Sequence, residues 1–470
     1  MRNEEMQIKE SGYRIEKDGL GEEALPEDAV YGIHSLRASR NFPISMRGID
    51  DDLILNLARV KKAAAIANEK AGYLSGDKAE AIIYACNELL AGRYHDAFLS
   101  DAMQGGAGTS IHMNACEVIA NIAIKHLGGN YGDYSVVHPL DHVNMCQSTN
   151  DVVPTAAKLT ALDKTDRLLE ALRELQEMLN AKSAEFDSIL MVGRTQLQDA
   201  VPMRAGQMFK AYAAMIKRSI AHIKDTQKLL HYSNMGGSAI GSSINVDRKY
   251  YELIIDEMSA ETGRKLCRCE DLFDGTQNAD DFAALSSAVK VCAVKLSKMA
   301  SDFRLLSSGP MAGLGEVHLP PRQSGSSIMP GKINPVIPEA LNQAAFLVIG
   351  HDATIAVAVE GGQLELNVFL PVIMYQLFEE TDILTNAIRV FTENCLKDIQ
   401  MDAELCKEHL DKSFAVMTAL NPRIGYDKST QIVKAAQKSK RPVIEVAKEY
   451  GISEEEMETI LEPHSMTELL

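Results

Sequence analysis

Several features that would place this chain in a membrane, outside the cell or on a nucleic acid are missing from its sequence. Residues 1–19 carry charges of both signs and no apolar core, so they are not a secretory signal peptide. No run of about 18 apolar residues predicts a membrane span. A formal net charge of −17 and the lack of any basic tract argue against nucleic acid as a partner.

Cysteines are few and scattered. Several of the eight lie inside apolar helical patterns, where cysteine behaves as a small hydrophobic residue. Cys267 and Cys269 lack the two-residue spacing and the second ligand pair of a zinc site, so no metal centre is expected. This usage of cysteine indicates a reducing, cytoplasmic compartment.

Glycine-rich phosphate loops are also absent. No glycine motif of the Rossmann type follows a predicted strand, and residues 105–108 (GGAG) lack both a flanking strand and a basic residue. A chain of 470 residues with 46% hydrophobic content is nevertheless long enough for two or three domains with substantial cores.

The middle of the chain is predicted to form long helices. Between residues 282 and 306 apolar side chains alternate in steps of three and four, a heptad repeat that favours packing against other long helices. Similar stripes occupy residues 162–179 and 209–230. Two more helices are expected from about 340 to 359 and from about 371 to 395, and the first of these is apolar on all sides and therefore expected to be buried.

These five helices predict an all-α fold of three domains. Residues 1–150 hold shorter helices, such as 75–91 and 117–127, and form an N-terminal, mostly helical domain. Residues 151–397 form the central helical bundle, and residues 398–470 a small C-terminal helical domain. In the last of these, Ser453 followed by three glutamates is typical of a helix start.

A long segment in the central domain has little helical pattern. It runs for about 34 residues from 306 to 340, and loops of that length inside compact domains are usually functional. From Val317 to Pro338 it has no Asp or Glu, and its sequence SGSSIMPGKINP (324–335) combines adjacent hydroxyls, glycines and a lysine. His318 and Arg322 add positive charge. We therefore expect it to bind a small anion.

Hydroxyl and amide side chains also gather in three other segments: GTSIHMN (108–114), QSTND (147–151) and GRTQLQD (193–199). Asp151 and Pro154 are typical of a helix start, which places Ser148, Thr149 and Asn150 beside free backbone amides. A carboxylate can bind there without an arginine. Helix capping explains any one of these residues alone, but four such segments together favour a binding site.

Eight blocks of sequence cover nearly the whole chain: YGIHSLRASRNFPIS (31–45), QGGAGTS with the following MN and EVIAN (104–121), HVNMCQSTNDVVPT (142–155), GRTQLQDAVPM (193–203), MGGSAIGSSIN (235–245), GSSIMPGKINPVIPE (325–339), GQLELNV (362–368) and TALNPRIGYD (418–427). In content and order they resemble the fumarase/aspartase superfamily of lyases. The resemblance implies a homotetramer built on a twenty-helix core. It also implies elimination of a group from C2 of a succinyl compound after abstraction of the C3 proton, releasing fumarate.

Within the superfamily the blocks are more similar to aspartases, the aspartate ammonia-lyases, than to fumarases. Gln196 stands where fumarases typically carry histidine, and residues 31–38 and 334–339 are similar to the aspartase versions. His112 is a departure, because both groups usually have asparagine there. The implied reaction converts L-aspartate to fumarate and ammonia without an organic cofactor.

The resemblance also implies roles for individual residues. Four hydroxyls are implied as donors to the carboxylate that gains charge in the reaction: Thr109, Ser148, Thr149 and Ser327. A second group clamps the α-carboxylate: Thr195, Lys332 and Asn334. Asn150 and Gln196 are implied to face the amino group.

The catalytic base is the least obvious assignment. From the residues alone, a histidine or a glutamate is the expected base, because a serine hydroxyl is very weakly acidic. The resemblance points instead to Ser326, acting as an oxyanion. Glu365 is a candidate buried carboxylate, either in a salt bridge that anchors a helix or near the site.

Three other functions stay open at this point. The chain fits a fumarate hydratase, a lyase for a related amino acid, or a catalytically inactive helical scaffold of the same superfamily. Intact Ser326, Lys332 and Asn334 argue against the scaffold, because a scaffold has no physical need for them.

Overall fold

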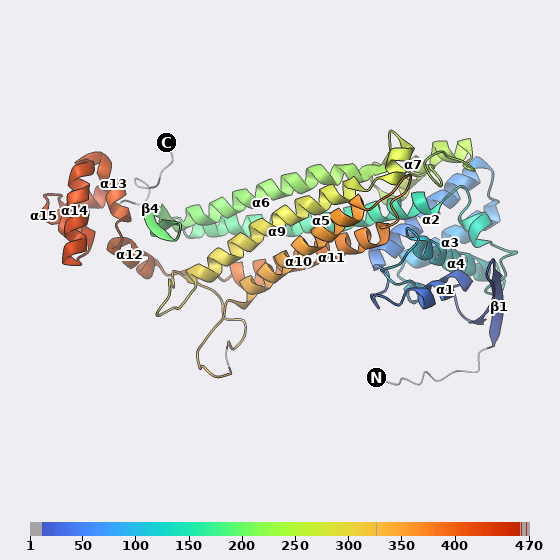
Figure 1. The fold of residues 1–470 in the computed structure, drawn as a ribbon, viewed down its shortest axis with the longest axis horizontal. Coiled ribbons are helices and arrows are strands. Elements are labelled where there is room, and N and C mark those ends of the chain that lie inside the picture. Colours follow the sequence, from blue (N-terminus) through green and yellow to red (C-terminus); the bar gives the residue numbers. More distant parts are fainter. Residues whose placement is uncertain (1–11, 326, 461, 463–466, 468–470) are drawn as a thin grey trace. The chain divides into compact units, whose positions relative to one another are not determined.

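The computed structural model describes residues 12–325, 327–460, 462 and 467, and helices predominate among them (Figure 1). The prediction of a mostly helical fold is therefore confirmed. The described residues also contain four two-stranded sheets, which the sequence patterns did not predict.

The chain divides into two compact units. The first comprises residues up to 167, 223–290 and 348–382, and the second comprises 168–222, 291–347 and 383–470. The boundaries between units lie inside five long helices: α5 (Thr149–Glu185), α6 (Ala205–Gln227), α9 (Asp280–Leu306), α10 (Val336–Glu360) and α11 (Leu370–Phe391).

The first unit contains the shorter helices of the N-terminal half. They are α1 (Ile33–Asn41), α2 (Asp51–Ala71), α3 (Gly76–Leu90), α4 (Thr109–His126), α7 (Arg248–Thr262) and α8 (Leu272–Gln277), with single turns at His95–Ala97, Pro139–Val143 and Lys228–His231. Its strands form an antiparallel pair, β1 (Tyr13–Asp18) with β2 (Gly21–Pro26), and a parallel pair, β5 (Tyr232–Ser233) with β6 (Cys267–Arg268).

The second unit contains the C-terminal helices and two antiparallel pairs. The strand pairs are β3 (Leu190–Thr195) with β4 (Gln198–Arg204) and β7 (Val317–His318) with β8 (Gln400–Met401). The helices are α12 (Ala403–Lys412), α13 (Ala415–Ile424), α14 (Tyr426–Ser439), α15 (Val443–Glu449) and α16 (Glu454–Ile460), and a single turn lies at Thr392–Leu396.

Helix α2 organises the packing of the first unit. Asp50 caps its start, because the carboxylate accepts the backbone N–H of Asp52, and Gly72 ends it in the left-handed conformation. Alanines between these ends let other helices approach closely. In Figure 1, α2 packs against α3 and α7, and α3 packs against α4.

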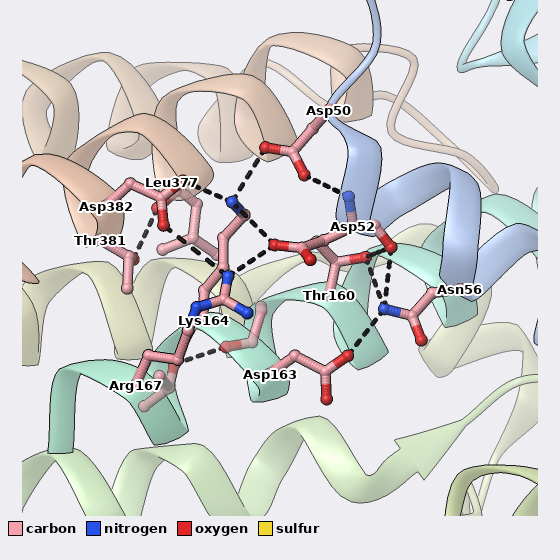
Figure 2. A network of polar contacts seen from close by, with 12 residues as sticks. Asp50, Asp52, Asn56, Thr160, Asp163, Lys164, Arg167, Leu377, Thr381 and Asp382 are labelled. Carbon is pink, nitrogen blue, oxygen red and sulfur yellow. Dashed lines mark hydrogen bonds and ion pairs between the residues drawn. The ribbon is translucent and has the colours of Figure 1, made fainter. Parts of the chain in front are cut away.

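A buried lysine connects α5 to α2 and α11 in the same unit. Figure 2 shows Lys164 surrounded by the carboxylates of Asp50, Asp52 and Asp382. Burial raises the pKa of Asp50, against the opposing effect of Lys164. Burial also acts to raise the pKa of Asp52, but hydrogen bonds from Arg167 and charge from Lys164 outweigh it and hold that pKa below its usual value. The network fixes where α2 begins relative to α5.

The predicted heptad helix is confirmed as α9. Every apolar residue of its repeat is at most 9% exposed: Phe282, Leu285, Val289, Cys292, Leu296, Met299, Phe303 and Leu306. In the second unit the ring of Phe303 contacts those of Phe209 on α6 and Phe391 on α11. The helix expected at 117–127 begins earlier than predicted, at Thr109.

Helix α10 differs from its expected burial. It is apolar on all sides as predicted, yet Phe346, Leu347 and Val357 are at least half exposed in this chain. It is also long and apolar enough to cross a membrane, although no such run was expected from the sequence. One such helix is weak evidence for a membrane, because a core helix of a bundle meets the same criteria.

The C-terminal helices of the second unit share a small core with strand β3. Val192 packs with apolar residues of α12 to α15, including Leu410, Leu420 and Val446. The predicted helix start at Ser453 is confirmed by a reciprocal pair of hydrogen bonds with Glu456, whose N–H donates to Ser453 Oγ over 3.1 Å.

Candidate functional site

Helix α5 begins at Thr149, slightly earlier than the start that Asp151 and Pro154 indicated, and Pro154 lies inside it. The N–H of Asn150 donates to Ser148 Oγ over 3.2 Å, and the N–H of Ser148 donates to the Asp151 carboxylate over 2.9 Å. These short-range contacts fix the first turn. The side chains of Ser148, Thr149 and Asn150 are half-buried there. The positive end of the helix dipole therefore lies beside two hydroxyls and an amide, an arrangement that suits an anion.

Asp151 is the buried acid beneath this turn. Its side chain has no exposed surface, and it also accepts the N–H of Ser238 over 3.1 Å. Burial raises the pKa of Asp151 to about 6, although the backbone hydrogen bonds and Lys61 act in the opposite direction. Through these hydrogen bonds Asp151 stabilises the first turn of α5.

Helix α4 begins next to α5. Gly108 precedes it with φ of +91°, and a Cβ there would lie only 2.9 Å from Cγ1 of Val153 on α5. Glycine is needed both for this conformation and for the close approach. Thr109, the first residue of α4, is exposed, and its hydroxyl donates to the carbonyl of Gly106 over 2.7 Å. The structure thus brings Thr109 close to the start of α5.

His112 ties the two helix starts together. Its Nδ1 lies 2.7 Å from Thr149 Oγ1, and its Nε2 lies 2.8 Å from Nζ of Lys61 on α2. His112 is 1% exposed and Lys61 has no exposed surface. Burial, followed by the charge of Lys61, holds the pKa of His112 well below its usual value, so the imidazole is neutral.

Asn150 has a fixed amide orientation. Its Nδ2 donates to the carbonyl of Ala239 over 2.8 Å, and its backbone carbonyl accepts from Asn234 Nδ2 over 2.9 Å. The Oδ1 atom is therefore the part of this side chain that is left to accept a hydrogen bond from a ligand.

The second unit holds the other predicted residues. Thr195 ends β3, and Gln196 and Leu197 form the two-residue turn to β4 with φ of 53° and 62°. Positive φ at both positions is typical of a type I′ hairpin turn. Neither residue is glycine, and each left-handed position costs about 1–2 kcal/mol. The turn holds the Gln196 side chain exposed at the tip of the hairpin.

The long segment between α9 and α10 is confirmed as a loop interrupted only by β7 within the described residues. Asn334 closes its base, since its Nδ2 donates to the carbonyl of Gly325 over 2.7 Å. A Cβ at Gly325 would lie 2.1 Å from the carbonyl oxygen of Lys332, so only glycine fits there. Ser327 and Lys332 are exposed. Ser326, the predicted base, lies outside the described residues.

The acid-free character of this loop is a property of the sequence alone. Two of its three basic side chains have acidic partners among residues 398–402: Arg322 Nη2 lies 2.6 Å from Asp398, and His318 Nε2 lies 3.2 Å from Asp402. Among the described residues, Lys332 has no carboxylate partner. Two of the three basic side chains that the sequence offered to an anion therefore already have an acidic neighbour.

Two other expectations can be compared with the structure. Glu365 is exposed and has no ion-pair partner in the described part of the chain, so the prediction of a buried carboxylate was wrong. All eight cysteines lie within the described residues and all are free thiols.

Sequence reasoning missed two residues that position the predicted ones. Lys61 gave no signal because it lies beside Lys62 in an ordinary helical pattern, yet it is buried against His112. Glu316 is fully buried and binds Arg194, the neighbour of Thr195, through both carboxylate oxygens. The one feature of the sequence that points to Glu316 is its position directly before the acid-free segment that begins at Val317.

Two family profiles match this chain. One, described as "Lyase", matches residues 21–350, and one described as "Fumarase C C-terminus" matches residues 416–468. The chain belongs to this lyase family. The resemblance noted from its sequence blocks is therefore confirmed.

Relatives of this lyase extend over its full length. An aspartate ammonia-lyase of Pseudomonas aeruginosa is 47% identical over 457 residues, 96% of each chain, and one of Bacillus subtilis is 45% identical over 456 residues, 97% of this chain and 96% of the relative.

Two solved structures have the same fold as this chain. A fumarate lyase:delta crystallin of Brucella melitensis superposes with a TM-score of 0.95 at 44% identity, covering 97% of this chain and all of the other. A class II fumarase of Schistosoma mansoni superposes with a TM-score of 0.92 at 33% identity, covering 97% and 99%.

Proposed function

We propose that this lyase is an aspartate ammonia-lyase, which eliminates ammonia from L-aspartate to give fumarate. The observation that carries the proposal is the full-length similarity, at 44–47% identity, to proteins of that name from several bacterial genera. The hydroxyl-rich starts of α4 and α5 are consistent with a dicarboxylate substrate.

The hard step is removal of the C3 proton, which puts a second negative charge on the neighbouring carboxylate. Preorganised donors lower that barrier, and removal of one such donor typically costs about 2.7–4 kcal/mol. We assign this task to Thr109, Ser148, Thr149 and Ser327. The first three lie at the starts of α4 and α5, where helix dipoles add favourable potential.

The α-carboxylate and the amino group need different partners. Thr195, Lys332 and Asn334 form the proposed carboxylate clamp, supported by the lack of a competing carboxylate beside Lys332 within the described residues. Asn150 and Gln196 take the amino group. For Asn150 this assignment is supported by the orientation of Oδ1, an acceptor suited to an ammonium.

Ser326 is the proposed base. It follows Gly325, whose lack of a side chain allows the loop to close against Lys332 and Asn334. An oxyanion needs donors and positive charge, and Lys332 of the same loop is the cation available to it. We propose no organic cofactor and no metal for this chemistry.

We further propose a homotetramer in which each chain contributes five helices to a twenty-helix core. The exposed apolar side chains of α10 support this, because a contiguous apolar face of that kind marks an interaction surface. The division into domains 1–150, 151–397 and 398–470 remains part of the proposal. Segments 104–114 and 142–151 meet within one chain through His112 and Thr149, so the expectation that they reach a site from different chains was wrong. That segment 325–334 of each site comes from another chain remains part of the proposal.

A reducing, cytoplasmic location is consistent with the eight free thiols. The proposal includes neither a membrane nor nucleic acid as a partner.

Fumarate absorbance tests the function directly. Purified protein is given aspartate, then malate, and the ultraviolet absorbance of fumarate is followed. We expect a strong signal with aspartate and a very weak one with malate, because Gln196 cannot act as an imidazole acid or base. Faster hydration than amination of fumarate at high ammonium would instead identify a fumarate hydratase, and no signal with either substrate would indicate a scaffold.

A further inference from the structure

The buried contacts of Lys61 constrain where hydrogens lie in the candidate site. Nζ of Lys61 lies 2.9 Å from Asn144 Oδ1, 3.0 Å from Gln147 Oε1 and 2.8 Å from His112 Nε2. An ammonium has three hydrogens and no lone pair, so it matches three acceptors. Three partners at hydrogen-bond distance around a fully buried nitrogen therefore fit a charged lysine.

The two amides are held with their oxygens toward Lys61. Gln147 donates through Nε2 to the carbonyls of Val143 and Met145, over 3.1 and 3.0 Å. Asn144 donates through Nδ2 to the carbonyl of Gln147 over 3.3 Å. Because each nitrogen is occupied by a carbonyl, each side-chain oxygen must face the lysine.

His112 then has one tautomer that suits both neighbours. If Nε2 accepts from Lys61, the single hydrogen of the neutral imidazole sits on Nδ1 and is donated to Thr149 Oγ1. In the described part of the chain, His112 is the one hydrogen-bond partner of that hydroxyl. Thr149 Oγ1 thus accepts the hydrogen of His112 Nδ1. Its own hydroxyl hydrogen must then point away from the histidine.

We propose that His112 is a positioning residue for Thr149: held by Lys61, it donates from Nδ1 to Thr149 Oγ1 and so obliges the threonine hydroxyl to present its hydrogen to the substrate. This inference rests on the proposed function and specifies how one of its carboxylate donors is oriented. Without the Nδ1 hydrogen, the Thr149 hydroxyl would donate inward to the histidine and would be lost to the substrate. The tautomer that carries its hydrogen on Nε2 would have that consequence.

Burial and nearby groups act on the charge of Lys61 in opposite directions. Burial lowers the pKa of Lys61, and Cys116, Asp151 and Cys86 act in the opposite direction. The same burial keeps His112 neutral, which excludes a doubly protonated ring that would repel the ammonium.

Two substitutions separate the two nitrogens of the ring. In His112→Asn the amide occupies the place of Nδ1 and can still donate to Thr149, whereas in His112→Gln it occupies the place of Nε2 and can still accept from Lys61. We expect His112→Gln to lower kcat for aspartate by about 100-fold, the lower end of the loss for one preorganised oxyanion donor, with a much smaller change in KM. His112→Asn should lose less.

A Thr149→Val background provides the control for a purely structural role. If His112 acts through the hydroxyl, His112→Gln should add little to the loss already caused by Thr149→Val. Equal fold-losses in both backgrounds, or a larger loss for His112→Asn than for His112→Gln, would overturn the proposal. Urea unfolding of each variant shows how much of any loss comes from stability.

The tautomer itself can be observed in the wild-type protein. Solid-state NMR of protein labelled with ¹⁵N-histidine identifies His112 by the signals missing from His112→Asn. A protonated Nδ1 with an unprotonated Nε2 is the expected result, and a protonated Nε2 would overturn the inference. Because this readout needs no turnover, it decides the inference even if wild-type protein releases no fumarate from aspartate, a result that would reject the proposed function alone.

Discussion

Arg194 and Glu316 form a two-point ion pair, with Nη2 lying 2.6 Å from Oε1 and Nη1 lying 2.8 Å from Oε2. The carboxylate has no exposed surface, and His409 Nδ1 lies 2.7 Å from the same Oε1. The pair joins the hairpin that carries Thr195 to the first part of the long loop between α9 and α10. It therefore anchors one part of the proposed carboxylate clamp, the hairpin, within its own unit.

Replacing Arg194 with Met should lower the free energy of unfolding by about 3–5 kcal/mol, because it leaves a buried carboxylate without its main partner. Urea unfolding followed by circular dichroism measures the loss. The matched control is the double variant Arg194→Met with Glu316→Gln, which removes the unpaired charge and should lose less than the single variant. A single variant as stable as wild type would show that His409 alone compensates Glu316.

Asp151 should make stability depend on pH in an unusual direction. Its pKa is about 6 in the folded chain, against about 3.9 for an unfolded aspartate, so the folded state holds the proton more tightly. Its contribution to stability is therefore full below pH 4 and is lost as the pH rises through 6. The stability difference between wild type and Asp151→Asn should fall by about 3 kcal/mol in total, most of it between about pH 4 and 6. A difference that is flat or rises with pH would contradict a raised pKa.

Lys332→Met should raise KM for aspartate roughly 10- to 100-fold and lower the rate, since a hydrogen bond to a charged group contributes about 1.5–3 kcal/mol. Steady-state kinetics with aspartate measures both. Arg322→Met is the matched control, because Arg322 lies in the same loop but is already paired with Asp398. An unchanged KM in Lys332→Met would move the carboxylate clamp elsewhere.

Ser326→Ala should abolish fumarate release while helical content and oligomeric state stay as in wild type, because the hydroxyl supplies chemistry and not packing. Absorbance, circular dichroism and light scattering measure the three properties. Ser324→Ala, two residues earlier in the same loop, is the control and should stay active. Near-normal turnover in Ser326→Ala would remove Ser326 as the base.

Two inactive variants should partly restore each other if each site is shared among chains. Thr149→Ala and Ser326→Ala are unfolded together in equal amounts and reassembled, and by random assortment about one site in four then has both residues intact. Activity approaching a quarter of wild type is expected. Inactive mixtures, with mixed oligomers proven by mass spectrometry, would mean that both residues of a site come from one chain.

The sequence by itself determined those elements that depend on side chains close to one another in the chain. The heptad repeat of α9 and a helix start close to Asp151 follow from side-chain periodicity and capping, which involve neighbours within one or two turns. The family was also evident, because its blocks span the chain in order.

Tertiary structure decided what periodicity cannot express. Asp398 and Asp402 pair with two basic side chains of a segment, 317–338, that has no acids of its own, and Lys61 meets His112 across 51 positions of the chain. Glu365 proved exposed, and α10 has an apolar face that its own chain leaves uncovered. Such contacts join segments that are distant in sequence, so no local spacing encodes them, and only the folded chain shows which charges meet.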